Sequence, residues 1–160
     1  MRHVLVRRLA YTPEQLFALV GDVERYPLFV PWITSLRAWN RREAGQGATT
    51  LDAEAQVRFS VVRERFATRV RLDAPAMVIQ ATLIAGPFRH LQNRWSFKPL
   101  AQDNAATGCE LTFEIDFEFG SRMLHSLLAA NFDRAVAALV NCFERRAEQL
   151  YGSAPRLRLS

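Results

Sequence analysis

The sequence predicts an α+β domain in which a curved antiparallel sheet of about seven strands grips one long C-terminal helix. Residues Ser121 to about Tyr151 carry apolar side chains at three- and four-residue spacing, with no interrupting Pro or Gly, which is the pattern of an amphipathic helix. Most of the chain before them alternates between apolar and polar residues, as strands with one buried face do. A length of 160 residues with 49% hydrophobic content suits one domain with its own core.

The N-terminal region is expected to form one strand and two short helices. The strand is expected from His3 to Ala10. The segment Thr12-Pro13-Glu14-Gln15 is a capping box with Pro at the first helical position, and it predicts a helix that ends at Gly21. Asp22 is expected to cap a second short helix that Pro27 and Pro31 end. Residues Tyr26 to Trp32 then form a rigid aromatic elbow.

Six further strands are expected between Ile33 and Phe119. Residues 48–72 contain no Gly or Pro but are too many for one strand, so a turn is expected near Phe59 to Val61, within Arg58 to Val62. A polar, flexible loop is expected from Pro99 to Gly108. The expected strands are Ile33–Arg42, two within Ala48–Leu72, Met77–Ile84, one after Gly86-Pro87, and Cys109–Phe119.

The C-terminal helix is the element around which the sheet is expected to curve. Ser121 is suited to cap its start and Gly152 to end it. About 30 residues at about 1.5 Å each predict a continuous rod roughly 45 Å long, which needs a large partner surface. We therefore expect a single domain over residues 1–152 and a flexible basic tail over residues 153–160.

Several classes of function lack their usual sequence signals. No stretch approaches 18 consecutive apolar residues, so no membrane-spanning helix is predicted. Cys109 and Cys142 lie far apart, which predicts neither a zinc site nor a disulfide framework and favours a reducing cytoplasm. His3, His90 and His125 lack metal-ligand spacing, and there is no nucleophile elbow or phosphate-binding Gly loop. We predict no metal site, no catalytic residue and no enzymatic activity.

The formal charge of +5 and the pI near 10.0 permit contact with anionic partners such as lipid headgroups or RNA. Arginines 63, 65, 69 and 71 alternate along one predicted strand, and we expect acids of the neighbouring strand, such as Asp52 and Glu54, to neutralise part of this row. Exposed aromatic residues do not accompany the row, so DNA is not an expected partner. A transient membrane surface is the expected anionic partner.

Three segments resemble one protein family. The strings DVERYPLFVPW (Asp22–Trp32), RERFATRV (Arg63–Val70) and GPFRHLQNRWSFKPL (Gly86–Leu100) are similar to the coenzyme Q-binding START-like family of the helix-grip (SRPBCC) superfamily. The resemblance covers about Arg2 to Tyr151. It implies a small bacterial protein that binds ubiquinone or a similar polyprenyl lipid in a cavity under the long helix and supports respiration. Family members often carry Cys where this chain has Ile33, and tend to have Gly near the expected turn.

The same resemblance implies two other functions. A sibling branch contains ribosome-associating toxins that block subunit joining, and the superfamily also contains polyketide cyclases and dehydratases. A cyclase-like reaction needs a positioned acid or base, and Glu64 is the only charged residue expected on an inward face. Ligand binding is therefore the favoured function, with ribosome association as the first alternative and cyclisation or dehydration as the second. The expected location is the cytoplasm, with peripheral contact at the inner membrane.

The predicted ligand site combines the elbow, the sheet and the long helix. Small inward residues at positions 53, 55 and 81 leave space beneath the helix, unless they interdigitate with bulky neighbours in a dry core. Polar residues at inward positions (Glu64, Thr68, Asn93 and Asn131) are suited to orient a headgroup, or to bond each other or water. The elbow either gates the cavity or packs as a corner. The predicted ligand-binding residues are Tyr26, Pro27, Phe29, Val30, Trp32, Glu64, Phe66, Thr68, Phe88, Leu91, Trp95, Phe97, Leu128, Asn131 and Phe132.

Overall fold

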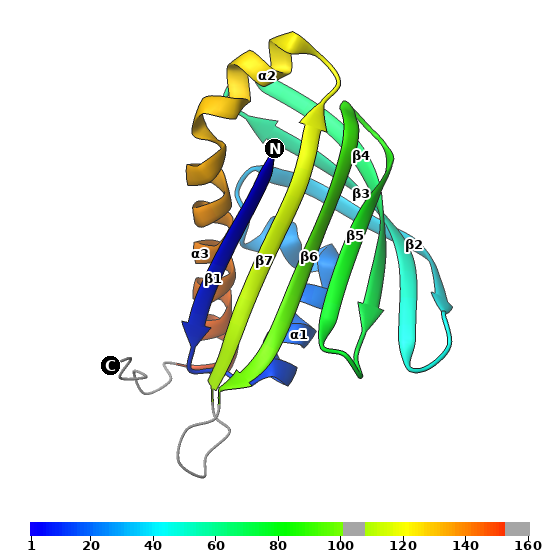
Figure 1. The fold of residues 1–160 in the computed structure, drawn as a ribbon, viewed down its shortest axis with the longest axis vertical. Helices are drawn as coiled ribbons and strands as arrows, with labels where there is room; N and C mark the ends of the chain where they lie inside the picture. The colour runs from blue at the N-terminus through cyan, green and yellow to red at the C-terminus, as the bar shows by residue number, and fades with distance from the viewer. Residues whose placement is uncertain (101–107, 153–160) are drawn as a thin grey trace.

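The computed structural model describes residues 1–100 and 108–152, and within them it contains one seven-stranded sheet with helices on its concave side (Figure 1). The predicted fold class and the seven strands are confirmed. The strands are β1 (Arg2–Leu9), β2 (Ile33–Glu43), β3 (Ala48–Phe59), β4 (Val62–Asp73), β5 (Val78–Ala85), β6 (Phe88–Leu100) and β7 (Gly108–Phe119). The α-helices are α1 (Pro13–Gly21), α2 (Arg122–Leu128) and α3 (Phe132–Tyr151), and the 3₁₀ segments are η1 (Val23–Leu28) and η2 (Ala129–Asn131).

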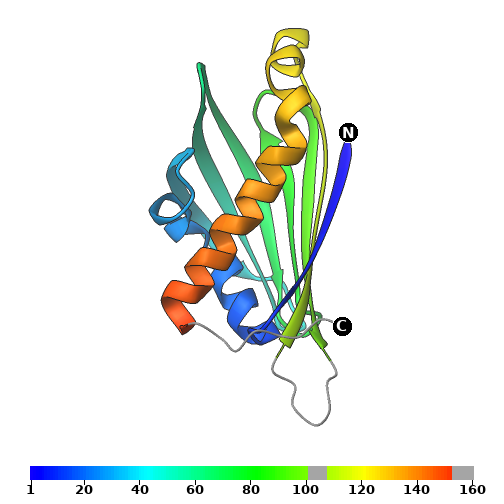
Figure 2. The same cartoon turned by 90° about the vertical axis from the view of Figure 1, so that its left-hand side faces the viewer.

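The sheet is antiparallel throughout, with the strand order β1-β7-β6-β5-β4-β3-β2. Strands β1 and β2 follow each other in sequence but lie at opposite edges, so α1 and η1 must cross from one edge to the other. Register shifts interrupt the β2–β3 ladder at two points and the β4–β5 ladder at Ala67/Thr68. Such bulges bend and twist a sheet. The sheet curves around α3, which crosses the concave face diagonally (Figure 2).

Local signals at the start of α1 are confirmed in atomic detail. The N–H of Gln15 donates to Thr12 Oγ1 over 3.1 Å, and the N–H of Thr12 donates to Gln15 Oε1 over 3.0 Å, which completes the capping box. The second short helix differs from the expectation. It is the 3₁₀ segment η1, which contains Pro27, and Asp22 makes no side-chain cap to it. A Pro inside the segment removes a backbone donor and prevents a regular α-helix there.

The turn between β3 and β4 is confirmed at Ser60-Val61, between the paired residues Phe59 and Val62. Ser60 has a φ of 57°, a left-handed conformation that glycine adopts most readily, which accounts for the Gly that the family resemblance leads one to expect there. Pairing of β3 with β2 ends at Val57, and pairing of β4 with β5 begins only at Ala67. The tip of this hairpin therefore extends beyond the strands on both sides of it.

The prediction of one continuous C-terminal rod is wrong. Ser121 caps the start as expected, accepting from the N–H of Leu124 over 3.1 Å, but the helix is interrupted by η2 before α3 begins at Phe132. No Pro or Gly causes the break, so the sequence contains no strong local signal for it. Leu124 and Leu128 of α2 pack on the cluster formed by Leu91, Phe117 and Phe119. The break lets α2 cover this end of the sheet while α3 crosses the rest.

By length and composition alone, the segment Arg122–Tyr151 meets the criteria for a membrane-crossing helix, although no run of 18 apolar residues exists. One such helix is weak support for a span, because the core helix of a soluble fold passes the same test. Here α3 buries Val136, Val140, Phe143 and Ala147 against the rest of the domain. We therefore describe it as the helix that the sheet encloses.

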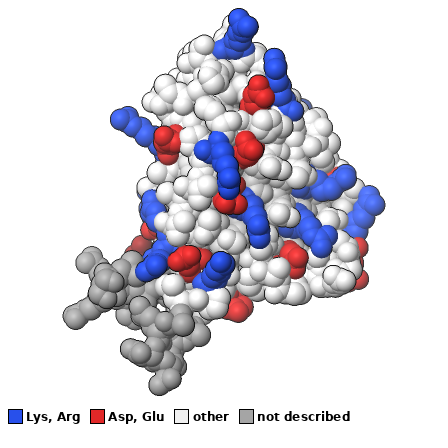
Figure 3. Space-filling view, viewed as in Figure 1, with Lys and Arg blue, Asp and Glu red and all other residues white. Residues whose placement is uncertain are grey.

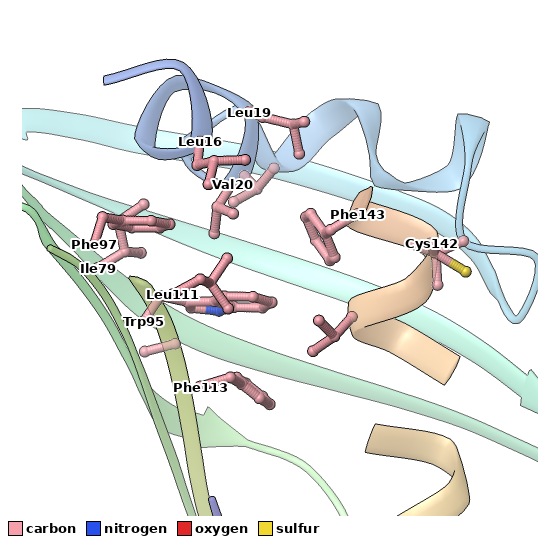
Figure 4. Close-up of a cluster of buried hydrophobic side chains, with 14 of the residues drawn as sticks. Leu16, Leu19, Val20, Ile79, Trp95, Phe97, Leu111, Phe113, Cys142 and Phe143 are labelled. Atoms are coloured by element: carbon pink, nitrogen blue, oxygen red, sulfur yellow. The ribbon is translucent and has the colours of Figure 1, made fainter. Parts of the chain in front are cut away.

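The core is concentrated where α1, η1 and α3 meet the sheet (Figure 4). Phe143 of α3 lies at its centre, with ring centroids 4.9 Å from Trp95, 5.1 Å from Tyr26 and 5.1 Å from Phe29. Phe97 projects from β6 toward α1, and its ring centroid lies 5.9 Å from that of Phe17. Side chains of the protein itself thus fill the space between α1 and the sheet.

On the outer face of the sheet, the predicted neutralisation of arginines by Asp52 and Glu54 is confirmed. Arg69 Nε donates to Asp52 Oδ1 over 3.0 Å, and Arg65 Nε lies 3.8 Å from Glu54 Oε1. Asn40, at a bulge in β2, donates to the other oxygen of Asp52 over 3.0 Å. Hydrogen bonds from Arg69 and then Asn40 lower the pKa of Asp52 below its usual 3.8.

Substitution of Asp52 by Asn is expected to reduce the dependence of stability on acidic pH. Because the folded-state pKa of Asp52 is lowered, its ionised form stabilises the fold above pH 3.8, and this contribution disappears as the pH falls through the lowered value. The difference in free energy of unfolding between the natural protein and Asp52→Asn should therefore shrink from neutral pH toward acid. Urea unfolding at a series of pH values measures it. A difference that is constant with pH would contradict the assignment.

Candidate functional site

A cavity of about 300 Å³ lies between the concave face of the sheet and α3, above the filled core. Its wall is contributed by η1, all of the strands from β2 to β7, and the helices α2 and α3 with the intervening η2. None of the 28 lining residues is Asp, Glu, His, Lys, Arg or Cys. The lining residues are Val23, Tyr26, Trp32, Ile33, Leu36, Ala53, Ala55, Val57, Phe59, Phe66, Thr68, Val70, Ile79, Ala81, Phe88, Leu91, Asn93, Trp95, Phe113, Ile115, Phe119, Leu128, Asn131, Phe132, Ala135, Val136, Leu139 and Phe143.

Small side chains create the space. Ala53 and Ala55 on β3 and Ala81 on β5 are buried and line the cavity, as the sequence predicts. They lie on the sheet opposite Ala135 of α3, which also lines it. Asn131 is exposed and borders the same space, so the cavity reaches the surface beside η2, at the break between α2 and α3.

Few polar groups face the cavity. Thr68 is buried on β4, and the Oδ1 atom of Asn93 on β6 is buried without a hydrogen-bond partner. The hydroxyl of Tyr26 donates to the carbonyl of Val20, and burial, followed by the nearby charge of Asp22, raises the Tyr26 pKa far above its usual value. A lining of this kind suits a largely apolar ligand with one or two polar groups.

Ten of the fifteen predicted ligand-binding residues line this cavity. From the elbow and the sheet come Tyr26, Trp32, Phe66, Thr68, Phe88, Leu91 and Trp95, and from the C-terminal segment Leu128, Asn131 and Phe132. Their position is therefore the predicted one, and their contact with a ligand stays a prediction.

The elbow is built mainly as a packed corner. The rings of Phe29 and Phe143 meet edge to face. The guanidinium of Arg146 lies 5.5 Å from the centroid of the Phe29 ring. Val30 is fully buried in the core, and Pro27 lies within η1. Pro27, Phe29 and Val30 do not line the cavity, although they were predicted to do so, because Phe29 and Val30 pack in the core and Pro27 is part of η1.

Glu64 and Phe97 also lie outside the cavity. Both occupy inward-facing positions of their strands, but α3 does not cover the part of the sheet where they lie. Glu64 is on the hairpin that extends past β2 and β5, beside Arg63 and Arg65 in a shallow hollow. Phe97 lies under α1 in the filled core. Alternation predicts the face of a side chain but not which element covers it.

Sequence reasoning did not assign several lining residues to the site. Strands β2 and β3 curve over the cavity and bring four residues to it: Ile33, Leu36, Val57 and Phe59. Phe119 reaches the cavity because α2 turns back over the end of β7. Phe119 is buried, and the other four are half-buried. The curvature that directs them to one space depends on the bulges, which have no strong sequence signal.

Neither cysteine lines this cavity. Cys109 on β7 and Cys142 on α3 are both buried, and burial is the main cause that raises the pKa of Cys109 to about 12. Such a thiol is protonated at neutral pH. Within residues 1–100 and 108–152, no three His, Cys, Asp or Glu side chains gather closely enough to hold a metal ion.

The sequence matches a family profile described as polyketide cyclase / dehydrase and lipid transport, over residues 9–144. The chain belongs to this family. Among solved structures, an 18 kDa protein from Caulobacter crescentus is 52% identical, with a TM-score of 0.78 over 96% of this chain and 99% of that one. A START superfamily protein from Mycobacterium smegmatis, 23% identical over 93% of this chain and 98% of that one, has a TM-score of 0.75 and shares the fold.

Two curated relatives with different names match most of this chain. The ribosome association toxin RatA of Vibrio cholerae is 34% identical over 144 residues, which are 90% of this chain and 93% of the toxin. A mitochondrial coenzyme Q-binding protein COQ10 homolog of Xenopus laevis is 35% identical over 146 residues, 90% of this chain and 57% of that protein. The chain is thus a START-like family member with the predicted helix-grip fold, related to both proteins.

Proposed function

We propose that this protein binds a polyprenyl quinone, ubiquinone or a close analogue, without chemically altering it. The observation that carries the proposal is the apolar cavity of about 300 Å³, open beside η2, which none of the described acidic, basic, His or Cys residues lines. The similarity to a coenzyme Q-binding COQ10 homolog supports this choice of ligand. In this proposal the protein acts in the cytoplasm, transiently at the inner membrane, and supports respiratory electron transport.

Apolar burial alone is sufficient for useful affinity. Each buried methylene contributes roughly 0.8 kcal/mol, so one five-carbon prenyl unit offers about 3–4 kcal/mol before costs. Loss of translational freedom and ordering of side chains remove several kcal/mol. A few prenyl units within the cavity therefore suffice, and the polar groups of Thr68, Asn93 and Asn131 would orient the headgroup rather than dominate affinity.

Acid–base catalysis has little support in the cavity wall. Tyr26 is the only ionisable side chain among the described residues that line it, and its hydroxyl is held by the carbonyl of Val20. Its pKa is far above its usual value, so it is a poor proton donor or acceptor near neutral pH. This supports the binding of a ligand over cyclisation or dehydration, although the family includes polyketide cyclases.

Gently purified protein is expected to contain a prenyl quinone that organic extraction and mass spectrometry identify. Trp95→Ala, which removes a buried indole from the cavity wall, should lower the recovered quinone several-fold per folded protein molecule. Trp39→Ala, which removes a partly exposed indole from β2, serves as the matched control. Absence of any prenyl lipid from the natural protein would refute the proposal.

Association with ribosomes is the second candidate function. It is favoured by the 34% identity to the RatA toxin of Vibrio cholerae over most of both chains, together with the net charge of +5. Sucrose-gradient profiles after overexpression separate the two functions. Accumulation of free ribosomal subunits would favour ribosome association, whereas an unchanged profile with a respiratory defect on deletion of the gene would favour quinone binding.

A further inference from the structure

Several of the exposed apolar side chains lie at the end of the molecule where the cavity opens. Val61, at the tip of the β3–β4 hairpin, is 84% exposed, and Met123 and Leu127 of α2 are 73% and 49% exposed. In both cartoon views the hairpin and α2 lie at the same end of the domain (Figures 1 and 2). Exposed aliphatic residues gathered at one end require an explanation, since a protein surface in water does not favour them.

The hairpin that carries Val61 also carries an unusual pair of charges. Arg58 and Arg63 lie directly opposite each other across the β3–β4 ladder, an arrangement of like charges that destabilises a sheet. Among the described residues, neither arginine takes part in an ion pair, whereas Arg65 and Arg69 on the same strand each have an acidic partner. An anion bound between them would offset this cost.

Helix α2 also combines exposed aliphatic side chains with an arginine. Leu124 and Leu128 of this helix pack on the core, but none of its residues is fully buried, and its first residue, Arg122, takes part in no ion pair within the described residues. The space-filling view shows basic side chains reaching the upper end of the visible face (Figure 3). Two separate elements thus present aliphatic side chains beside unpaired arginines at one end.

This end is continuous with the cavity. Phe59 precedes the hairpin turn and Leu128 ends α2, and both line the cavity wall. We infer that the hairpin tip and α2 form a docking surface for a bilayer that contains anionic lipids. Val61, Met123 and Leu127 enter the acyl boundary, while Arg58, Arg63 and Arg122 contact lipid phosphates. The inference deepens the proposed function, because it names the surface through which a lipid ligand is exchanged.

RNA is a less suitable partner than a bilayer for this docking surface. Single-stranded nucleic acid is usually bound by aromatic side chains that stack on bases between basic residues, and the three exposed apolar residues here are all aliphatic. A bilayer uses aliphatic and basic side chains together. RNA binding is therefore treated as an outcome of the test.

Sedimentation with vesicles tests the docking surface. The natural protein should bind vesicles of phosphatidylcholine with 30% phosphatidylglycerol in a salt-sensitive manner, and should bind pure phosphatidylcholine vesicles far more weakly. Arg58→Gln combined with Arg63→Gln should lower binding about tenfold or more, since each arginine at an anionic surface contributes about 1 kcal/mol. Val61→Asp combined with Met123→Asp should lower it by a similar factor or more. None of these side chains is buried, so the variants should stay folded, and loss of the facing Arg58–Arg63 charges should raise the melting temperature slightly.

Control variants carry changes of the same kind elsewhere. Arg41→Gln with Arg94→Gln removes the same charge from exposed positions of β2 and β6, and Leu150→Asp places an acid at the far end of α3. Both controls should bind vesicles as the natural protein does. Equal loss in variants and controls, or binding to ribosomes with none to vesicles, would overturn the inference. If the natural protein contains quinone but does not bind vesicles, the docking surface is refuted while the proposed function stands.

Discussion

Replacement of Ala81 by Phe is expected to abolish lipid binding, by 100-fold or more in affinity, while the protein stays folded. Ala81 is buried on β5, between Val70 of β4 and Asn93 of β6, and its side chain points into the cavity. A phenyl ring at this position occupies space that a prenyl chain would otherwise fill, and loss of about two buried prenyl units would exceed 5 kcal/mol before compensation. Quinone per protein molecule, measured by extraction and mass spectrometry, provides the readout.

The stability of Ala81→Phe should change little. Inserting a ring into a filled core costs about 1–3 kcal/mol, but here the ring enters an open space and gains apolar burial of its own. Thr82→Phe is the matched control, because Thr82 lies on the same strand with its side chain exposed on the outer face. It should bind quinone as the natural protein does. Normal quinone binding by Ala81→Phe would mean that the ligand does not occupy this cavity.

The strands and the first helix could be predicted because their signals are local. Alternation of side chains placed Ala53, Ala55 and Ala81 on the inner face, and the capping box fixed the start of α1. The break at Ala129–Asn131 could not be predicted, because no breaker residue marks it and its cause is tertiary contact of α2 with β6 and β7. At Ala129–Asn131 the local sequence favours a continuous helix, whereas packing of α2 on the sheet interrupts it.

In the candidate site, too, local patterns could be predicted and long-range packing could not. Ten predicted residues surround one cavity, because the face of each strand follows from its alternation. Glu64 was misplaced because alternation does not reveal that the hairpin extends beyond its neighbours. Phe97 was misplaced because nothing in the strand itself indicates that α1, and not α3, covers that position. Whether an inward side chain lines a cavity or a filled core depends on the path of the covering helix, which is fixed only by the assembled fold.

Phe143→Ala is expected to destabilise the fold by about 3–5 kcal/mol, the usual cost of removing a buried Phe. Phe143 is 2% exposed, and its ring contacts Trp95 of β6 together with Tyr26 and Phe29 of the elbow. The substitution removes the ring through which α3 contacts both the elbow and strand β6. Urea unfolding followed by tryptophan fluorescence measures the loss, and a domain of this size should melt roughly 10 °C lower.

Two variants show whether this loss comes from the ring cluster. Phe143→Leu keeps an apolar side chain in place and should cost clearly less than Phe143→Ala, because it leaves a smaller void. Leu150→Ala removes apolar atoms from a half-exposed position on the same helix and should cost less than about 1 kcal/mol. A loss below 1 kcal/mol for Phe143→Ala would show that the elbow is held by its other contacts. The Tyr26 hydrogen bond to Val20 and the Arg146 contact with Phe29 would then suffice to keep the wall of the cavity in place.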